Sequence, residues 1–250
     1  MSNYIITPDN NFVLYKNSPF KCGITTRALG DFSVNGNRDE QIINLMSILG
    51  VTSCISMLPE HKSNIILLNN IINQIEVSDC DSILFRDKQN GFQGLVHCGW
   101  RSILDKVVEK TIAKLLGCGY QKPKIGAIIY TGICANCYEV NKDVYVKFRE
   151  DPIAREFFTY QEKYNNFSFN LPELLFQKLH DTGLKSENLN FFNLCSHCLK
   201  QNNRFLLFSE RRTEDKGKRN LAFIKINDIV IAGTTGNCPY IIFYLIPQNK

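Results

Sequence analysis

The hydrophobic pattern changes its period in the middle of the chain, and this change constrains the fold more than any other feature. Ser82–Arg86 and Gln93–His97 are short runs of apolar and β-favouring residues joined by turn residues, which predicts two neighbouring strands. Directly after them, apolar residues recur at helical spacing between Leu104 and Leu116, which predicts an amphipathic helix of about four turns. The pattern indicates a mixed α/β fold.

Turn and capping residues place the other elements. Ser102 and Asp105 resemble a capping box at the start of the long helix, and Gly117 can end it. A further helix is predicted over Leu171–Thr182, between Asn170 as N-cap and Gly183. A helix over Asn141–Arg149 and strands over Cys54–Met57, Asn64–Leu68, Lys124–Ile133, Phe205–Phe208 and Leu221–Ile226 complete the expected elements.

Length and composition suit one large domain, expected over residues 1–250. The chain has 250 residues, of which 44% are apolar, so it can bury a core without disulfides. It contains no run of about 18 apolar residues, and Met1–Asp9 has no signal-peptide core, so we expect no membrane segment and a cytoplasmic location. The net charge of +5 is spread along the chain, which gives no reason to expect a nucleic-acid partner.

The counts of histidine and cysteine limit the metal chemistry. The chain has four histidines, whereas a multicopper centre needs roughly ten imidazoles, so no laccase-type copper centre is expected. The chain also has ten cysteines. In a reducing compartment these are free thiols or metal ligands rather than a disulfide framework.

Cys80 and His97 are the strongest chemical feature. Cys80 leads into the first predicted strand and His97 ends the second, so the pairing of these strands would bring the two side chains close together. His61, which comes earlier in the sequence, lies in a loop between two short predicted strands. One thiolate and two imidazoles form a ligand set suited to catalytic zinc, with a fourth position open. The alternative is a small buried cysteine and a histidine that serves only the core.

Two Cys-x-x-Cys pairs form a second feature. Cys134 with Cys137 and Cys195 with Cys198 could hold a structural zinc or act in redox chemistry. The 57 residues between the pairs greatly exceed the usual gap of about 15–20, which favours free thiols instead.

Arginines near these features are candidates for anion binding. Arg211 and Arg212 follow a predicted strand and could form a fork for phosphate or carboxylate. Arg27 and Arg101 are further candidates. The alternative for each arginine is a solvated side chain or a surface ion pair.

At these residues the chain resembles a bacterial family. His97-Cys98-Gly99-Trp100-Arg101 and Asp79-Cys80 are its most specific motifs. The chain is similar to the laccase-domain family, variously called polyphenol oxidase, peptidoglycan editing factor and purine nucleoside phosphorylase, over about residues 22–226. Further matching stretches are Thr26–Gly30, Asn37–Arg38, Pro59–Lys62, Tyr138–Asn141, Cys195–Ser196 and Leu207–Arg212.

The resemblance implies a single-domain fold with a layered α-β-β-α arrangement and mixed sheets. It also implies a zinc site formed by His61, Cys80 and His97, at which copper is possible in vitro. The implied activities are phosphorolysis of adenosine, inosine, guanosine and methylthioadenosine, and deamination of adenosine. Arg27, Arg101 and Arg211 would bind the nucleoside and phosphate. We expect a monomer or a homodimer.

The chain also departs from the family, and this keeps other functions open. The segments before Asn37 and between His61 and Cys80 are shorter than in the family, and Tyr130-Thr131 replaces a Gly-Pro pair. A cysteine hydrolase or peptidoglycan-precursor editing enzyme would use Cys80 as nucleophile and His97 as base. A non-enzymatic module would bind zinc through the two Cys-x-x-Cys pairs.

Overall fold

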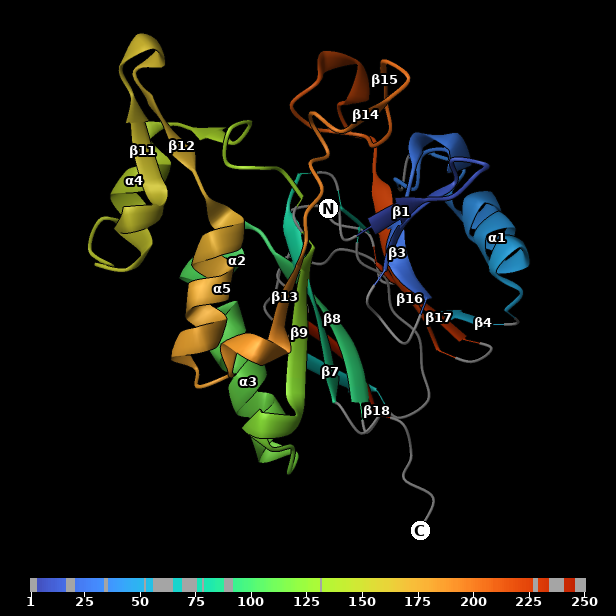
Figure 1. Cartoon of the computed structure of the whole chain (residues 1–250), viewed down its shortest axis with the longest axis horizontal. Coiled ribbons are helices and arrows are strands. Elements are labelled where there is room, and N and C mark those ends of the chain that lie inside the picture. The colour runs from blue at the N-terminus through green and yellow to red at the C-terminus, as the bar shows by residue number, and fades with distance from the viewer. Residues whose placement is uncertain are drawn as a thin grey trace.

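The protein folds into four layers, with two β-sheets inside and helices outside (Figure 1). This layered α-β-β-α arrangement with mixed sheets confirms the fold class predicted from the sequence. The computed structural model describes residues 4–16, 21–33, 36–51, 53–55, 65–68, 76–77, 79–87, 92–130, 132–226, 229–233 and 241–245.

A six-stranded sheet carries both cysteine features. The order across the sheet is β13 (Leu189–Phe192), β9 (Ile125–Tyr130), β7 (Asp81–Asp87), β8 (Phe92–Cys98), β18 (Ile241–Leu245) and β5 (Ile65–Leu68). Strands β7 and β8 are neighbours, as expected from their sequence, and they run antiparallel, whereas β9 and β13 run parallel.

A seven-stranded sheet lies against the first, and two small sheets lie outside them. The order of the larger sheet is β1 (Tyr4–Ile6), β2 (Phe12–Tyr15), β3 (Lys21–Thr25), β16 (Asn220–Ile226), β17 (Ile229–Gly233) and β4 (Ser53–Ile55), with β6 (Glu76–Val77) also paired to β16. The small sheets contain β10 (Glu139–Val140), β12 (Asn166–Phe169) and β11 (Phe158–Gln161), and β14 (Lys200–Gln201) with β15 (Arg204–Phe205).

Alternating side chains attach each sheet to its two neighbours. Ile83 and Phe85 of β7 pack in the core shared with α3 (Val107–Gly117) and α5 (Leu171–Asp181). Leu84, between them in sequence, packs in the core between the sheets. On the far side α1 (Arg38–Leu49) covers the seven-stranded sheet (Figure 1). Each fully buried side chain of this kind stabilises the fold by about 1.5–3 kcal/mol.

The helix predicted after β8 is broken into two. The first part is α2 (Trp100–Leu104), and the second, α3, begins only after Lys106, whose φ of 58° is left-handed. Ser102 lies inside α2 and donates a hydrogen bond to the Gly99 carbonyl at 2.8 Å, so the predicted capping box is wrong. The apolar spacing continues across the break, which is why the pattern indicated a single helix.

Other boundaries agree more closely with the sequence. Helix α5 follows Asn170, contains Pro172 in its first turn and ends before Gly183, which has the left-handed φ of 88°. Helix α4 (Lys142–Phe148) also lies where it is expected. The predicted strand over Phe205–Phe208 is reduced to Arg204–Phe205. In the described ranges no helix combines the length and apolar character needed to cross a lipid bilayer.

Candidate functional site

The pairing of β7 with β8 brings Cys80 and His97 to one place. Ser82 lies opposite His97 and Asp81 opposite Cys98, which sets Cys80 beside Gly99. The position that a Cβ would take on Gly99 lies 3.4 Å from Cys80 Sγ and 3.5 Å from His97 Nε2. The thiol and the buried imidazole therefore both approach the space that the absent side chain of Gly99 leaves. His61, the third predicted ligand, lies outside the described residues.

Two carboxylates fix the segment that contains Cys80. Asp79 accepts hydrogen bonds from Ser196 Oγ at 2.6 Å and from the Arg211 amide at 3.0 Å. The buried Asp81 accepts one from the Gly132 amide at 2.6 Å. Both carboxylates hold the segment to loops that lie far away in sequence. Sequence analysis missed this role, although Asp79 stands inside the Asp-Cys motif.

Burial makes the Cys80 thiol hard to ionise. Burial, followed by the charges of Asp79 and Asp81, raises the pKa of Cys80 to about 12, while Arg219 and Arg101 oppose this shift. An activated cysteine nucleophile needs a lowered pKa instead. A cation bound at the sulfur would favour deprotonation of the thiol.

Arg101 and Arg211 both approach the Cys80 segment, although they follow it at very different distances in sequence. Arg101 stands in α2, where its guanidinium stacks 4.1 Å from the centre of the Trp100 ring, and its charge reaches Cys80. The guanidinium of Arg211 lies 5.3 Å from the centre of the Tyr138 ring, and its amide holds Asp79. Arg101 lies in the short helix α2, and the longer helix α3 begins only at Val107.

Arg27 and Arg212 are bonded to the protein's own carboxylate. Arg27 Nη1 donates to both oxygens of the buried Asp215, at 2.6 and 2.8 Å. Arg212 Nε donates to the same carboxylate at 2.7 Å, and Nη1 donates to the carbonyls of Ser196 and His197. The Arg211–Arg212 fork predicted for an anion is not formed, because Arg212 is a buried structural residue.

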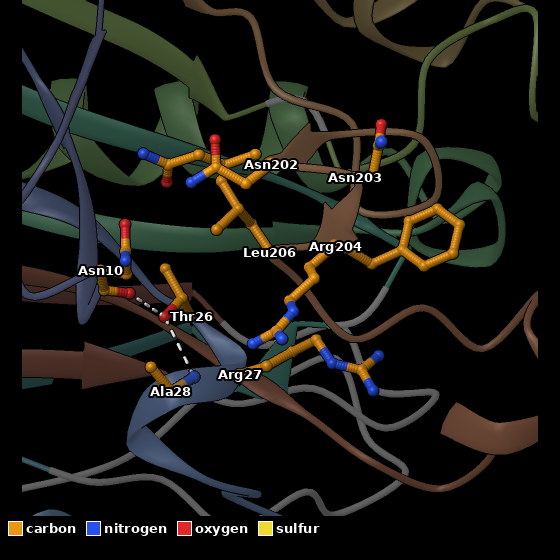
Figure 2. Close-up of a pocket in the computed structure, with 10 residues that line it drawn as sticks. Asn10, Thr26, Arg27, Ala28, Asn202, Asn203, Arg204 and Leu206 are labelled. Atoms are coloured by element: carbon orange, nitrogen blue, oxygen red, sulfur yellow. Dashed lines mark hydrogen bonds between the residues drawn. The ribbon is translucent and has the colours of Figure 1, made fainter.

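Arg27 also lines a pocket of about 820 Å³ (Figure 2). Its volume lies in the usual range for small-molecule sites, about 300–1,000 Å³. The side chain of Thr26 lies between the Asn10 carbonyl and the Ala28 amide at one wall of this pocket (Figure 2). Neither Arg101 nor Arg211 lines it. The three predicted substrate arginines therefore lie at two places, Arg27 at this pocket and the other two around Cys80.

The two Cys-x-x-Cys pairs meet, despite their separation in sequence. The four sulfur atoms of Cys134, Cys137, Cys195 and Cys198 all lie within 4.8 Å of one another and could hold a metal ion. We call this set the four-thiol cluster. Cys195 is buried, Cys134 and Cys137 are half-buried, and Cys198 is exposed. Burial raises the pKa of Cys195, but hydrogen bonds from the Cys134 and Cys198 amides outweigh it and lower that pKa below its usual value.

A family model assigns the chain to a class. The model described as multi-copper polyphenol oxidoreductase laccase matches residues 58–227, which is most of the chain. The protein therefore belongs to this laccase-like family, and the resemblance found in the sequence is confirmed.

Curated relatives carry a common name. A purine nucleoside phosphorylase of Clostridium acetobutylicum is 25% identical over 238 residues, which cover 86% of this chain and 95% of that protein. One from Rickettsia conorii is 26% identical over 139 residues, and one from Borreliella burgdorferi is 32% identical over 148 residues. In both of these matches the chain spans 57% of the relative's length, and 55% of this chain is covered.

Solved structures share the fold. Protein YfiH of Bacillus licheniformis has a TM-score of 0.76 and 19% identity, over 91% of this chain and all of that one. YlmD of Geobacillus stearothermophilus has a TM-score of 0.74 and 18% identity, over 90% of this chain and 98% of that one. At these identities the likeness establishes the fold.

Proposed function

We propose that the protein is a zinc-dependent purine nucleoside phosphorylase that also deaminates adenosine. Its substrates would be adenosine, inosine, guanosine and methylthioadenosine. The observation that carries the proposal is the convergence of Cys80 Sγ and His97 Nε2 on the space beside Gly99. Relatives named purine nucleoside phosphorylase at 25–32% identity support the substrate class.

The donor set fits zinc. A thiol and an imidazole nitrogen flank a space that a Cβ would fill, and both are zinc ligands. Cys80 and His97 would hold the ion together with His61, the third ligand in our proposal. Bound zinc would supply a Lewis acid and lower the pKa of a water molecule towards about 7.

The cations around Cys80 suit the second substrate, inorganic phosphate. Arg101 is exposed and its planar guanidinium can bind two phosphate oxygens at once, and Arg211 also lies beside the Cys80 segment. In phosphorolysis a phosphate oxygen bonds to C1′ of the ribose while the C1′–N9 bond breaks. The purine leaves with the electron pair and gains a proton. Arg27 remains a substrate-binding prediction, at the separate pocket of Figure 2.

Deamination would use the same site beside Cys80 and His97, without phosphate. Water adds to C6 of adenosine, and ammonia leaves as inosine forms. Phosphate takes no part in this step. The formation of adenine should therefore require phosphate, whereas the formation of inosine should not.

Product analysis tests the proposal. Zinc-loaded protein is incubated with adenosine, with and without phosphate, and adenine, ribose 1-phosphate and inosine are separated by chromatography. We expect adenine only with phosphate. Inosine should form in both cases, and with phosphate part of it should be converted further to hypoxanthine, because inosine is itself a proposed substrate. In Cys80→Ala, kcat/KM should fall at least about 10³-fold, because several kcal/mol of transition-state stabilisation are lost.

Cys118→Ser is the matched control, since Cys118 is an exposed cysteine at the end of α3 and should be replaceable without effect. The proposal is wrong if the wild type forms neither adenine nor inosine, or if Cys80→Ala is as active as the wild type. Loss of activity in Cys80→Ser with its zinc fully retained would favour a cysteine hydrolase.

A further inference from the structure

We propose that the four-thiol cluster binds one zinc ion, and that this ion fastens together the two loops that position the Cys80 segment. The site is separate from the proposed catalytic zinc. Neither Cys80 nor His97 is one of its ligands, and the binding of this ion does not depend on the proposed reaction. Its evidence is the geometry of the four sulfur atoms and of the loops that carry them.

The sulfur atoms have the spacing that a tetrahedral site needs. Zinc–sulfur bonds of about 2.3 Å place tetrahedral ligand atoms about 3.8 Å apart. The four Sγ atoms lie within 4.8 Å of one another, so small side-chain movements close them around an ion. Four cysteines complete the coordination of zinc and leave no open position, as in structural sites.

Each Cys-x-x-Cys pair lies on a turn that directs both of its thiols to one side. The Cys137 amide donates to the Cys134 carbonyl at 2.9 Å, and the Leu199 amide donates to the Cys195 carbonyl at 2.9 Å. The Cys134 amide also donates to Cys195 Sγ at 3.4 Å, across the two pairs. Hydrogen bonds of this kind orient the ligands of a metal site.

Strand pairing explains why the pairs meet. One pair follows β9 and the other follows β13, and these strands are parallel neighbours. The carboxyl ends of parallel neighbours lie at the same edge of the sheet, so both loops begin side by side. The Ser196 amide then donates to the Gly132 carbonyl at 2.6 Å and joins the loops directly.

The joined loops hold the Cys80 segment. Gly132 donates to Asp81, and Ser196 donates to Asp79, each at 2.6 Å. The two carboxylates flank Cys80 in sequence. An ion that fixes both loops therefore fixes the residues on either side of Cys80, and the four cysteines are positioning residues for that site.

The first experiment counts metal. The zinc-loaded full chain is freed of excess metal, and zinc per chain is measured by plasma mass spectrometry. Cys137→Ser and Cys198→Ser should each lose about one zinc per chain, whereas the matched control Cys118→Ser should lose none. An unchanged zinc count in both cluster variants overturns the proposal.

The second experiment does not need the cluster variants to fold. Zinc-edge X-ray absorption of Cys80→Ala should show about four sulfur ligands at about 2.3 Å, because only the four-thiol cluster would remain occupied. A nitrogen- or oxygen-rich shell overturns the proposal, as does the presence of two disulfides by thiol titration. Iron in place of zinc, detected by colour and by metal count, overturns the assignment of the ion.

These readouts separate the two zinc proposals. If the protein forms neither adenine nor inosine but Cys80→Ala keeps a four-sulfur zinc, only the proposed function fails. If adenosine is converted but cluster variants keep their full zinc content, only the four-thiol site fails. Positioning adds one further expectation: Cys137→Ser should lower kcat more than it raises KM for adenosine.

Discussion

The two cysteine regions of this protein lie next to each other and are built differently. Cys80 directly precedes β7, whose antiparallel neighbour is β8, and it lies close to His97 and to two carboxylates. The four-thiol cluster comes from parallel strands β9 and β13 and is surrounded by its own turn amides. The first region mixes ligand types and charges, whereas the second repeats one ligand four times.

The two proposals give zinc two roles in this protein. A mixed set with one thiol leaves a coordination position open for a substrate, while four thiols complete the coordination. The regions are linked through Gly132 and Ser196, so the closed site can support the open one. In these two proposals, cysteines that lie close together in the fold serve different functions.

The largest effect we expect in this comparison is on the support beneath the four-thiol cluster. Asp215→Asn should lower the free energy of unfolding by about 3–5 kcal/mol, because it leaves the buried Arg212 without its counter-charge. Arg212 in turn holds the carbonyls of Ser196 and His197, between Cys195 and Cys198. Urea unfolding followed by circular dichroism measures the change.

Glu150→Gln is the matched control for this variant. It makes the same change from carboxylate to amide in an exposed pair with Arg149, where the effect should stay within about 0.5 kcal/mol. If Asp215→Asn lowers the free energy of unfolding no more than Glu150→Gln does, the buried ion pair does not support the four-thiol cluster. The loops that carry the cysteines would then depend on the proposed metal alone.

The sequence predicted the Cys80 region better than the four-thiol cluster, for a physical reason. β7 and β8 are separated by only a few residues in sequence, so local patterning was enough to place Cys80 near His97. The two cysteine pairs are 57 residues apart, and their meeting depends on the parallel pairing of β9 with β13, which no local pattern reveals. Their separation had favoured free thiols, yet the structure gathers all four.

Local conformation limited the sequence analysis in a second way. Capping residues placed α5 correctly, because Asn170, Pro172 and Gly183 mark its ends. The break before α3 was missed because it depends on Lys106, a residue type with no preference for the left-handed region. Asp215 as the partner of Arg27 was also missed, since ion pairs between distant segments leave no periodic signal.

The next prediction tests the link between the two regions. A Cβ added at Gly132 would overlap the backbone carbonyls of Cys80 and Asp79. Gly132→Ala should therefore lower the free energy of unfolding by about 1–3 kcal/mol and displace Cys80, with a loss of activity. Thermal unfolding and adenosine turnover measure the two effects.

Gly117→Ala is the control for that variant, since a Cβ there meets nothing within 4 Å at the end of α3. It should cost no stability, and a small gain up to about 1 kcal/mol is expected. If Gly132→Ala behaves like Gly117→Ala in both assays, the loop does not hold the Cys80 segment, and the two regions are independent.

The smallest effect concerns the charges that distinguish the Cys80 region. Arg101 is exposed and stacked on Trp100, so its removal should cost little stability. Arg101→Ala should reduce phosphate-dependent formation of adenine about tenfold, since a hydrogen bond to a charged group contributes about 1.5–3 kcal/mol and exposure weakens it. Deamination needs no phosphate, so the rate of inosine formation in phosphate-free reactions should stay unchanged. Arg101→Lys keeps the charge but loses the planar fork, so its adenine rate should fall between those of wild type and Arg101→Ala.

Rates of adenine and inosine formation, measured over a range of phosphate concentrations, test the role of Arg101. An equal fall of both products would mean that Arg101 shapes the site as a whole, and an unchanged adenine rate would mean that phosphate binds elsewhere.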